Sequence, residues 1–214
     1  MKKVFISGSM AIKKLDNLVL KSLDRIILNK LQVSVGDAGG VDKLVQEYFC
    51  AKKYFNVVVY TILDNPRNVS CDFFQIKKVD TGNLKGRIAQ EKKDESMTKD
   101  SEYSFVIWDG KSKGSLNNIL RALRADKKVK VFYEKEKRFF RNEELNIEYI
   151  QKIFYENNGL GLKELAAHSN LSLSCIKEIV KAYPQFKIIS YYKGREQVKY
   201  SLELINVIAK EIKL

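Results

Sequence analysis

The first 141 residues alternate between short β-rich runs and amphipathic helical patterns, and this order constrains the fold more than any other feature of the 214-residue chain. Continuous apolar runs are typical of strands that are covered on both faces. Strand and helix in alternation predict an α/β fold, in which a parallel sheet carries helices on both faces. The expected strands are residues 3–8, 31–36, 56–62, 103–110 and 128–133, and the expected helices follow Asp16 and Asp42, span residues 85–98 and begin at Ser115.

The charge of the chain is strongly positive and unevenly distributed. The net charge is +13, and residues 1–141 carry 29 Lys and Arg against 17 Asp and Glu, while residues 142–214 carry 10 against 9. Such an excess on one domain indicates a polyanionic or phosphorylated partner. The alternative is a lysine-rich surface without a specific partner.

The sequence also bears on the compartment in which the chain acts. Its apolar runs are too short to span a bilayer, and its first residues lack the pattern of a signal peptide. Three cysteines without Cys-x-x-Cys spacing indicate reduced thiols rather than a disulfide or zinc framework. We therefore expect a cytoplasmic protein with no metal site and no membrane partner.

Glycine-rich loops at three strand ends indicate a site for a phosphate-bearing ligand. In a parallel sheet, ligands bind where the carboxyl ends of strands lead into helix N-termini. Glycine permits close approach of the backbone, and the free N–H groups of a helix start favour an anion. The sequence has neither a Walker P-loop nor the G-x-G-x-x-G dinucleotide pattern. The candidate ligand-binding residues are Gly8 and Ser9; then Gly36, Asp37, Gly39 and Asp42; and then Asp109, Ser112, Gly114 and Ser115.

Three carboxylates near these loops are candidate catalytic acids or bases, namely Asp37, Asp94 and Asp109. General acid–base catalysis needs such a group placed against the scissile bond. Arg87, on the same helical face as Asp94, is a candidate phosphate ligand because a guanidinium binds phosphate bidentately. The alternative is that this face is solvated and held by salt bridges.

Two further residues have alternative roles. Asp42 either belongs to the ligand site or caps the helix that follows it. Trp108 either stacks on a base or belongs to the core.

Three segments resemble the SLOG superfamily, which includes DNA-processing proteins and the LOG phosphoribohydrolases. GDAGGVDKLVQEYF (residues 36–49) resembles its G-x-A-x-G-x-D signature, and SEYSFVIWDGKSKGSLNNIL (residues 101–120) resembles its second signature. GRIAQEKKDESMTKDSEY (residues 86–103) resembles the helix that precedes this signature in the YspA-like branch. The resemblance covers residues 1–135 and implies a Rossmann-like sheet that binds nucleotides or their derivatives at these loops.

The chain departs from the LOG enzymes at one turn. Those enzymes carry a P-G-G-x-G-T-x-x-E motif, whose Glu serves N-glycosidic cleavage. The matching turn here, residues 112–118, lacks the Pro and the Glu, and Asn118 stands where the carboxylate would be. We therefore expect a sensor-like protein that binds a nucleotide-derived ligand. The alternative is an enzyme that cleaves an N-glycosidic or phosphate bond of a nucleotide.

Residues 142–214 follow a different pattern, which predicts a small winged-helix domain of α+β type. Three helical patterns are followed by a β-hairpin and a final helix, and a short turn joins the second and third helices. In a DNA-binding helix-turn-helix, the recognition helix enters the major groove. The candidate DNA-binding residues are Ser174, Lys177 and Lys181 on the third helix and Lys193 and Arg195 on the wing.

The partner of this second domain is open to alternatives. The domain order resembles that of DNA-processing protein A, which implies single- or double-stranded DNA as a partner. The modest positive charge of the domain equally suits protein contact or formation of a homo-oligomer.

Overall fold

The computed structural model describes residues 2–192 and 195–212, and the chain divides into two compact units, Met1–Ile150 and Gln151–Leu214. The sequence placed the domain boundary between residues 141 and 142, whereas the units divide within helix α5 (Ile147–Asn158). With the structural boundary, the first unit carries 29 Lys and Arg against 20 Asp and Glu, and the second carries 10 against 6. Both units therefore have a net positive charge.

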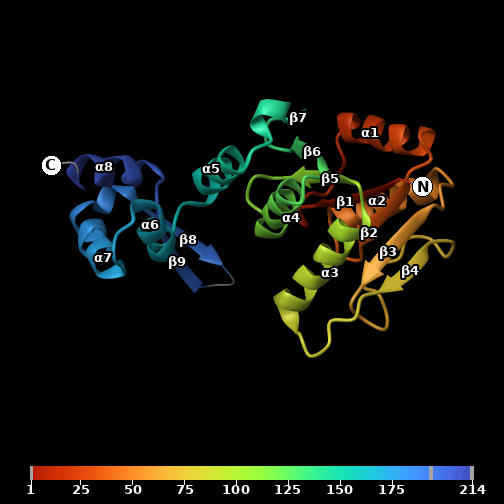
Figure 1. Cartoon of the computed structure of the whole chain (residues 1–214), viewed down its shortest axis with the longest axis horizontal. Coiled ribbons are helices and arrows are strands. Elements are labelled where there is room, and N and C mark those ends of the chain that lie inside the picture. Colours follow the sequence, from red (N-terminus) through yellow and green to blue (C-terminus); the bar gives the residue numbers. More distant parts are fainter. Residues whose placement is uncertain (1, 193–194, 213–214) are drawn as a thin grey trace. The chain divides into compact units, whose positions relative to one another are not determined.

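The first unit is built on a seven-stranded sheet with the order β4-β3-β2-β1-β5-β6-β7 (Figure 1). All neighbouring strands are parallel except the β6–β7 pair. This confirms the predicted α/β class and is consistent with a Rossmann-like fold. The strands are β1 (Lys3–Gly8), β2 (Gln32–Gly36), β3 (Val57–Thr61), β4 (Gln75–Lys78), β5 (Tyr103–Trp108), β6 (Lys128–Tyr133) and β7 (Arg138–Phe139).

Strands β4 and β7 lie at the two edges of the sheet, and the sequence analysis did not predict them. All four residues of β4 are exposed, and only one of them is apolar. Strand β7 has two residues and pairs antiparallel with β6. Neither edge strand contains the continuous apolar run by which a doubly covered strand is recognised.

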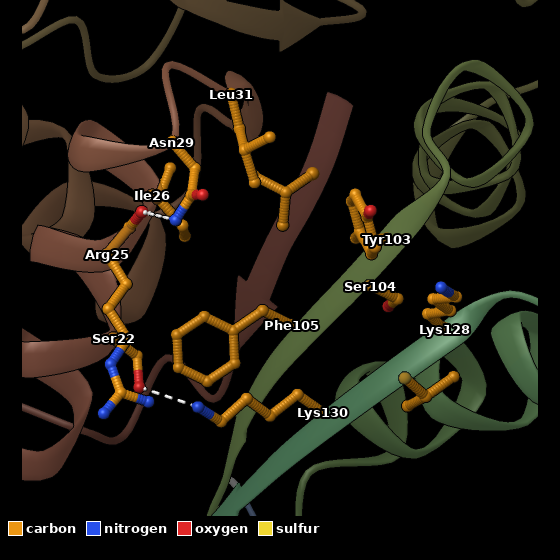
Figure 2. Close-up of a pocket in the computed structure, with 12 residues that line it drawn as sticks. Ser22, Arg25, Ile26, Asn29, Leu31, Tyr103, Ser104, Phe105, Lys128 and Lys130 are labelled. Carbon is orange, nitrogen blue, oxygen red and sulfur yellow. Dashed lines mark hydrogen bonds between the residues drawn. The ribbon is translucent and has the colours of Figure 1, made fainter. Parts of the chain in front are cut away.

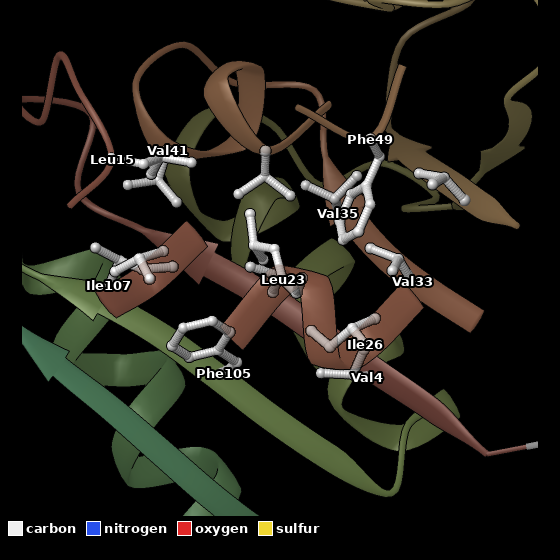
Figure 3. Packing of buried hydrophobic residues seen from close by; sticks show 14 of the residues in the cluster. Val4, Leu15, Leu23, Ile26, Val33, Val35, Val41, Phe49, Phe105 and Ile107 are labelled. Atoms are coloured by element: carbon white, nitrogen blue, oxygen red, sulfur yellow. The ribbon is translucent and has the colours of Figure 1, made fainter. Parts of the chain in front are cut away.

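Helices cover both faces of the sheet. Helices α1 (Asn17–Leu28) and α2 (Val41–Ala51) bury their apolar stripes in one core with alternate residues of β1, β2, β3 and β5. Figure 3 shows Leu23 and Ile26 of α1 next to Val4 and Phe105 of the sheet. On the opposite face, Met97 of α3 (Gly86–Asp100) packs with Phe5, and α4 (Lys113–Arg124) contacts α3.

Local capping sets where these helices begin. Asp16 caps α1 by accepting a hydrogen bond from Leu18 N at 2.8 Å. The sequence placed the start of the fourth helix at Ser115, which was wrong, because Ser112 is the N-cap and the helix begins at Lys113. Asp42 is not a cap either, since Gly40 occupies the N-cap of α2 and Asp42 lies inside the first turn.

Residues 147–192 and 195–212 contain the helices and the hairpin that the sequence predicted for the second domain, in the predicted order. Helices α6 (Leu162–Ser169) and α7 (Leu173–Ala182) precede the hairpin of β8 (Lys187–Tyr192) and β9 (Arg195–Tyr200), and α8 (Glu203–Ile212) follows it. A core of Leu160, Leu165, Ile176, Val180, Tyr200, Leu204 and Ile208 joins them. The winged-helix assignment itself stays a prediction.

Each helix in residues 2–192 and 195–212 is too short or too polar to cross a membrane. The same residues contain no cluster of three His, Cys, Asp or Glu side chains that would hold a metal ion. Cys50, Cys71 and Cys175 are free thiols.

Substitution by alanine should affect stability differently at the adjacent glycines Gly39 and Gly40. Gly40 has φ +68°, and a Cβ there would lie 2.4 Å from Met10 Cα, whereas a Cβ on Gly39 would meet no atom within 4 Å. Gly40→Ala should therefore lower the free energy of unfolding by about 2 kcal/mol, from strain and overlap. Gly39→Ala should change it by less than about 0.5 kcal/mol. Urea unfolding of both variants checks this, and equal effects would contradict the close approach of the β1–α1 loop to α2.

Candidate functional site

The carboxyl ends of β2, β1 and β5 meet at the centre of the sheet. The chain runs from β1 to β2 on one side and later returns to β5 on the other side, so β1 and β5 flank a topological switch point. Ligands of open α/β sheets bind at such points. All three loops that the sequence singled out lie at this edge of the sheet.

Ser9 joins the first and third of these loops. Its hydroxyl accepts a hydrogen bond from Asp109 N at 3.2 Å and lies 3.4 Å from Ser115 Oγ. Ser9 and Ser115 are both buried. Their hydroxyl groups therefore hold the end of β1 against the start of α4.

Asp109 shapes the turn between β5 and α4. Its Oδ1 accepts hydrogen bonds from Lys111 N at 2.9 Å and Ser112 N at 2.7 Å. Trp108 is fully buried and donates from Nε1 to Ser112 O at 3.1 Å. Trp108 therefore belongs to the core, and Asp109 stabilises a loop whose backbone leads directly into α4.

Asp37 is the most highly coordinated group at this edge. Its Oδ1 accepts from Arg67 Nη2 at 2.6 Å and from Lys93 Nζ at 3.2 Å. Its Oδ2 accepts from Thr61 Oγ1 at 3.0 Å and from Arg67 N and Nε at 3.2 Å each. Burial alone would raise the pKa of Asp37, but the hydrogen bonds from Arg67 and the charge of Lys93 hold that pKa well below its usual range. Asp37 is therefore ionised, and hydrogen bonds within the protein occupy the lone pairs of its carboxylate.

Lys93 and Arg67 are site residues that the sequence analysis missed. Lys93 is 2% exposed and lies on the buried stripe of α3 between Ala89 and Met97. Lys93 lies four residues after Ala89 and four before Met97, and this helical spacing could have placed it on the buried stripe from the sequence alone. Arg67 lies in the loop between β3 and β4, where no periodicity marks it.

Gly36 leaves room for Asp42 and Lys93. A Cβ on Gly36 would lie 2.4 Å from Asp42 Oδ2 and 2.9 Å from Lys93 Nζ. The same Asp42 oxygen accepts a hydrogen bond from Ala38 N at 3.3 Å. Burial raises the pKa of Asp42 to about 7, although the charge of Lys93 acts in the opposite direction.

The polar face of α3, for which the sequence left ligand contact and a solvated, salt-bridged surface as alternatives, lies against α4. Burial raises the pKa of Asp94, and the charges of Lys93 and Arg121 with a hydrogen bond from Asn118 oppose this rise. Glu91 Oε1 accepts from Asn117 Nδ2 at 3.3 Å and from Arg87 Nε at 3.0 Å. Arg87 is thus exposed and paired with Glu91.

The predicted ligand glycines separate into two kinds. A Cβ on Gly8 would lie 2.4 Å from Ile107 O, so packing inside the protein requires glycine there, as it does at Gly36. A Cβ on Gly39 or Gly114 would meet no protein atom within 4 Å. The backbone at the starts of α2 and α4 is therefore open to an incoming group.

A cavity of about 540 Å³ lies at the same end of the sheet. Residues 11–17 of the β1–α1 loop line it together with Asp109, Glu134 and Lys137. The charges of this lining balance, because Lys13, Lys14 and Lys137 are matched by Asp16, Asp109 and Glu134. Asp109 lines this cavity and also belongs to the loop that leads to Gly114.

Three of the predicted DNA-binding residues lie on one helix of the second unit. Ser174, Lys177 and Lys181 are exposed on α7, while Ile176 and Val180 of the same helix are buried. Lys181 Nζ donates to Glu178 Oε1 at 2.8 Å. Arg195 is exposed at the start of β9, and Lys193 lies outside the described residues.

Neither a protein-family model nor a curated protein sequence matches the chain. The fold and the edge described above define an α/β protein with a polar site at the carboxyl ends of its strands. The SLOG resemblance stays a prediction that rests on its three sequence motifs.

The raised pKa of Asp42 predicts a pH dependence of stability. Between pH 4 and 7 the folded state holds a proton on Asp42 that the unfolded state has released, so the free energy of unfolding should fall as the pH rises. The slope from this group is at most about 1.4 kcal/mol per pH unit. Asp42→Asn should remove much of this fall. Urea unfolding of parent and variant at pH 5 and pH 8 measures it, and identical pH dependence would contradict a raised pKa.

Proposed function

We propose that the first unit binds a nucleotide-derived ligand across the starts of α2 and α4, and acts as a sensor rather than a hydrolase. The observation that carries the proposal is the convergence of two open helix starts, at Gly39 and Gly114, on either side of the end of β1. Ser9 and Ser115 hold the start of α4 against the end of β1.

The charges around the edge suit a phosphate. Backbone N–H groups at the two helix starts, with the helix dipoles behind them, attract an anion. The exposed side chains of Lys111 and Lys113 add positive charge beside Gly114. Glu91 and Asn117, which are hydrogen-bonded to each other between α3 and α4, could exchange this bond for bonds to ribose hydroxyls.

The occupied carboxylates favour binding over catalysis. Asp37 accepts five hydrogen bonds, and Asp109 accepts two from its own loop. A general base needs a free lone pair directed at the proton that it removes. This argument excludes Asp37, whose two oxygens are both occupied; of the other two predicted catalytic residues, Asp94 is the one whose pKa burial raises.

The raised pKa of Asp94 supports the second candidate function, cleavage of an N-glycosidic or phosphate bond. A carboxylic acid with a raised pKa is suited to donate its proton to a leaving group. This cleavage would release a free base, a ribose phosphate or inorganic phosphate.

A nucleic-acid role for the second unit is part of the proposal. Leu160 and Tyr200 exchange two backbone hydrogen bonds of 2.8 Å, an antiparallel bridge at the position where winged helices have a short third strand beside the hairpin. Lys177, Lys181 and Arg195 would contact DNA phosphates. Contact with protein or a second copy of the chain is the alternative.

The binding proposal predicts a specific loss of affinity. Gly39→Val and Gly114→Val each fill space that the protein leaves open, so both variants should fold and lose at least about tenfold in affinity for the nucleotide that the parent binds. Ala51→Val, at the exposed far end of α2, is the control and should bind as the parent does. Calorimetric titration with AMP, NAD and cyclic nucleotides measures the affinities.

Two outcomes would redirect the proposal. Unchanged binding in both valine variants would place the ligand elsewhere. Chromatographic detection of free base or phosphate that disappears in Asp94→Asn would establish the enzyme alternative.

A further inference from the structure

A second cavity lies at the opposite end of the strands from the nucleotide edge. It has a volume of about 250 Å³ and is lined by the first residues of β5 and β6, by Val4 of β1 and by the last turns of α1 (Figure 2). The cavity lies beside the last turns of α1, where the first residues of β5 and β6 line it. The cavity therefore shares no lining residue with the edge described above.

Positive charge dominates the polar part of the lining. Arg25, Lys128 and Lys130 all line the cavity, and no Asp or Glu does. Across residues 2–192 and 195–212, no ion pair connects any of these three cations to a carboxylate. Unlike the cations around Asp37, they have no internal counterion.

Lys130 is the cation that burial affects most. Its ammonium group donates to Ser22 Oγ at 2.9 Å, and the Ser22 hydroxyl donates in turn to Leu18 O at 3.1 Å. The ring of Phe139, 4.0 Å away, offsets part of the lost hydration. Burial and the nearby charge of Arg25 lower the pKa of Lys130. A partly buried ammonium without a carboxylate retains a desolvation cost that an anion would relieve.

The remaining lining is apolar and partly aromatic. Ile26 and Leu31 lie on the α1 side, and Tyr103 and Phe105 lie on the sheet. Small-molecule sites combine such an apolar lining with a few polar groups that fix orientation. An inorganic ion alone would leave this apolar surface unused.

We propose that this cavity is a binding site for a small organic anion, whose acid group lies between Arg25 and Lys130 and whose apolar body packs against Phe105, Ile26 and Leu31. The acid group is a phosphate or a carboxylate, since both accept charge-assisted hydrogen bonds from Arg and Lys. The site is independent of the proposed nucleotide site.

Calorimetric titration of the intact chain with phenyl phosphate, benzoate, phenol and inorganic phosphate tests the proposal. Phenyl phosphate or benzoate should bind more tightly than inorganic phosphate or phenol, because only the former pair combines an acid group with an apolar body. Lys130→Met and Arg25→Met should each weaken this binding about tenfold or more through loss of one ion pair. Lys130→Met should still fold, because it replaces a partly buried charge by an apolar chain of similar length.

Two controls separate this cavity from other cationic surfaces. Lys21→Met removes an exposed charge from α1 one turn before Arg25, at a residue that does not line the cavity, and should leave the affinity unchanged. Gly114→Val, which blocks the nucleotide edge, should also leave it unchanged. Binding that survives Lys130→Met, equal binding of inorganic phosphate and phenyl phosphate, or no binding of either organic anion at about 10 mM would overturn the proposal.

Discussion

The buried carboxylate of Asp37 holds the carboxyl edge of the sheet together. It connects the end of β2 to Lys93 on α3 and to Arg67 in the loop after β3. The same loop is held by Asn68 Nδ2, which donates to Asp37 O at 2.9 Å, and by Ser70 N, which donates to Gln46 Oε1 at 3.0 Å. Elements that are distant in the sequence are thereby joined around one charge.

The energetics of this cluster favour specificity over net stability. A buried ion pair gains little relative to apolar packing of similar volume, because desolvation costs nearly as much as the Coulomb attraction returns. Removal of one partner is different, since an uncompensated buried charge costs about 3–5 kcal/mol. Alternative placements of α3 that separate Lys93 from Asp37 therefore carry a large penalty. The Asp37 cluster therefore fixes the position of the polar face of α3 relative to Gly39 and Gly114.

Parallel topology explains why much of this edge was predictable. Continuous apolar runs identified five strands, and the carboxyl ends of parallel strands must share one edge, so the loops at Gly36, Gly39 and Gly114 were expected together. The roles of individual residues at this edge were harder to predict from the sequence. Asp42 resembles a helix cap in sequence, yet Gly40 holds that position because Met10 passes too close for any side chain.

The partners of buried charges were the least predictable part. Arg67 lies in an irregular loop, and its pairing with Asp37 depends on how that loop folds back over β2. Arg25 and Lys130 are likewise distant in sequence and meet only because α1 lies over the start of β1 and beside β6. Periodicity shows which face of an element is buried, but it does not show which charges from different elements will share a site.

The central claim is that a nucleotide-derived ligand contacts the open backbone at Gly39 and Gly114. Two-dimensional NMR reports directly on the amide groups of these two residues when nitrogen-15-labelled protein is titrated with nucleoside monophosphates. The account predicts progressive shifts of the Gly39, Gly114 and Ser115 amide resonances, with no shift at Gly82, which is equally open but lies in the loop before α3. Shifts confined to other parts of the chain, or none with any nucleotide, would contradict it.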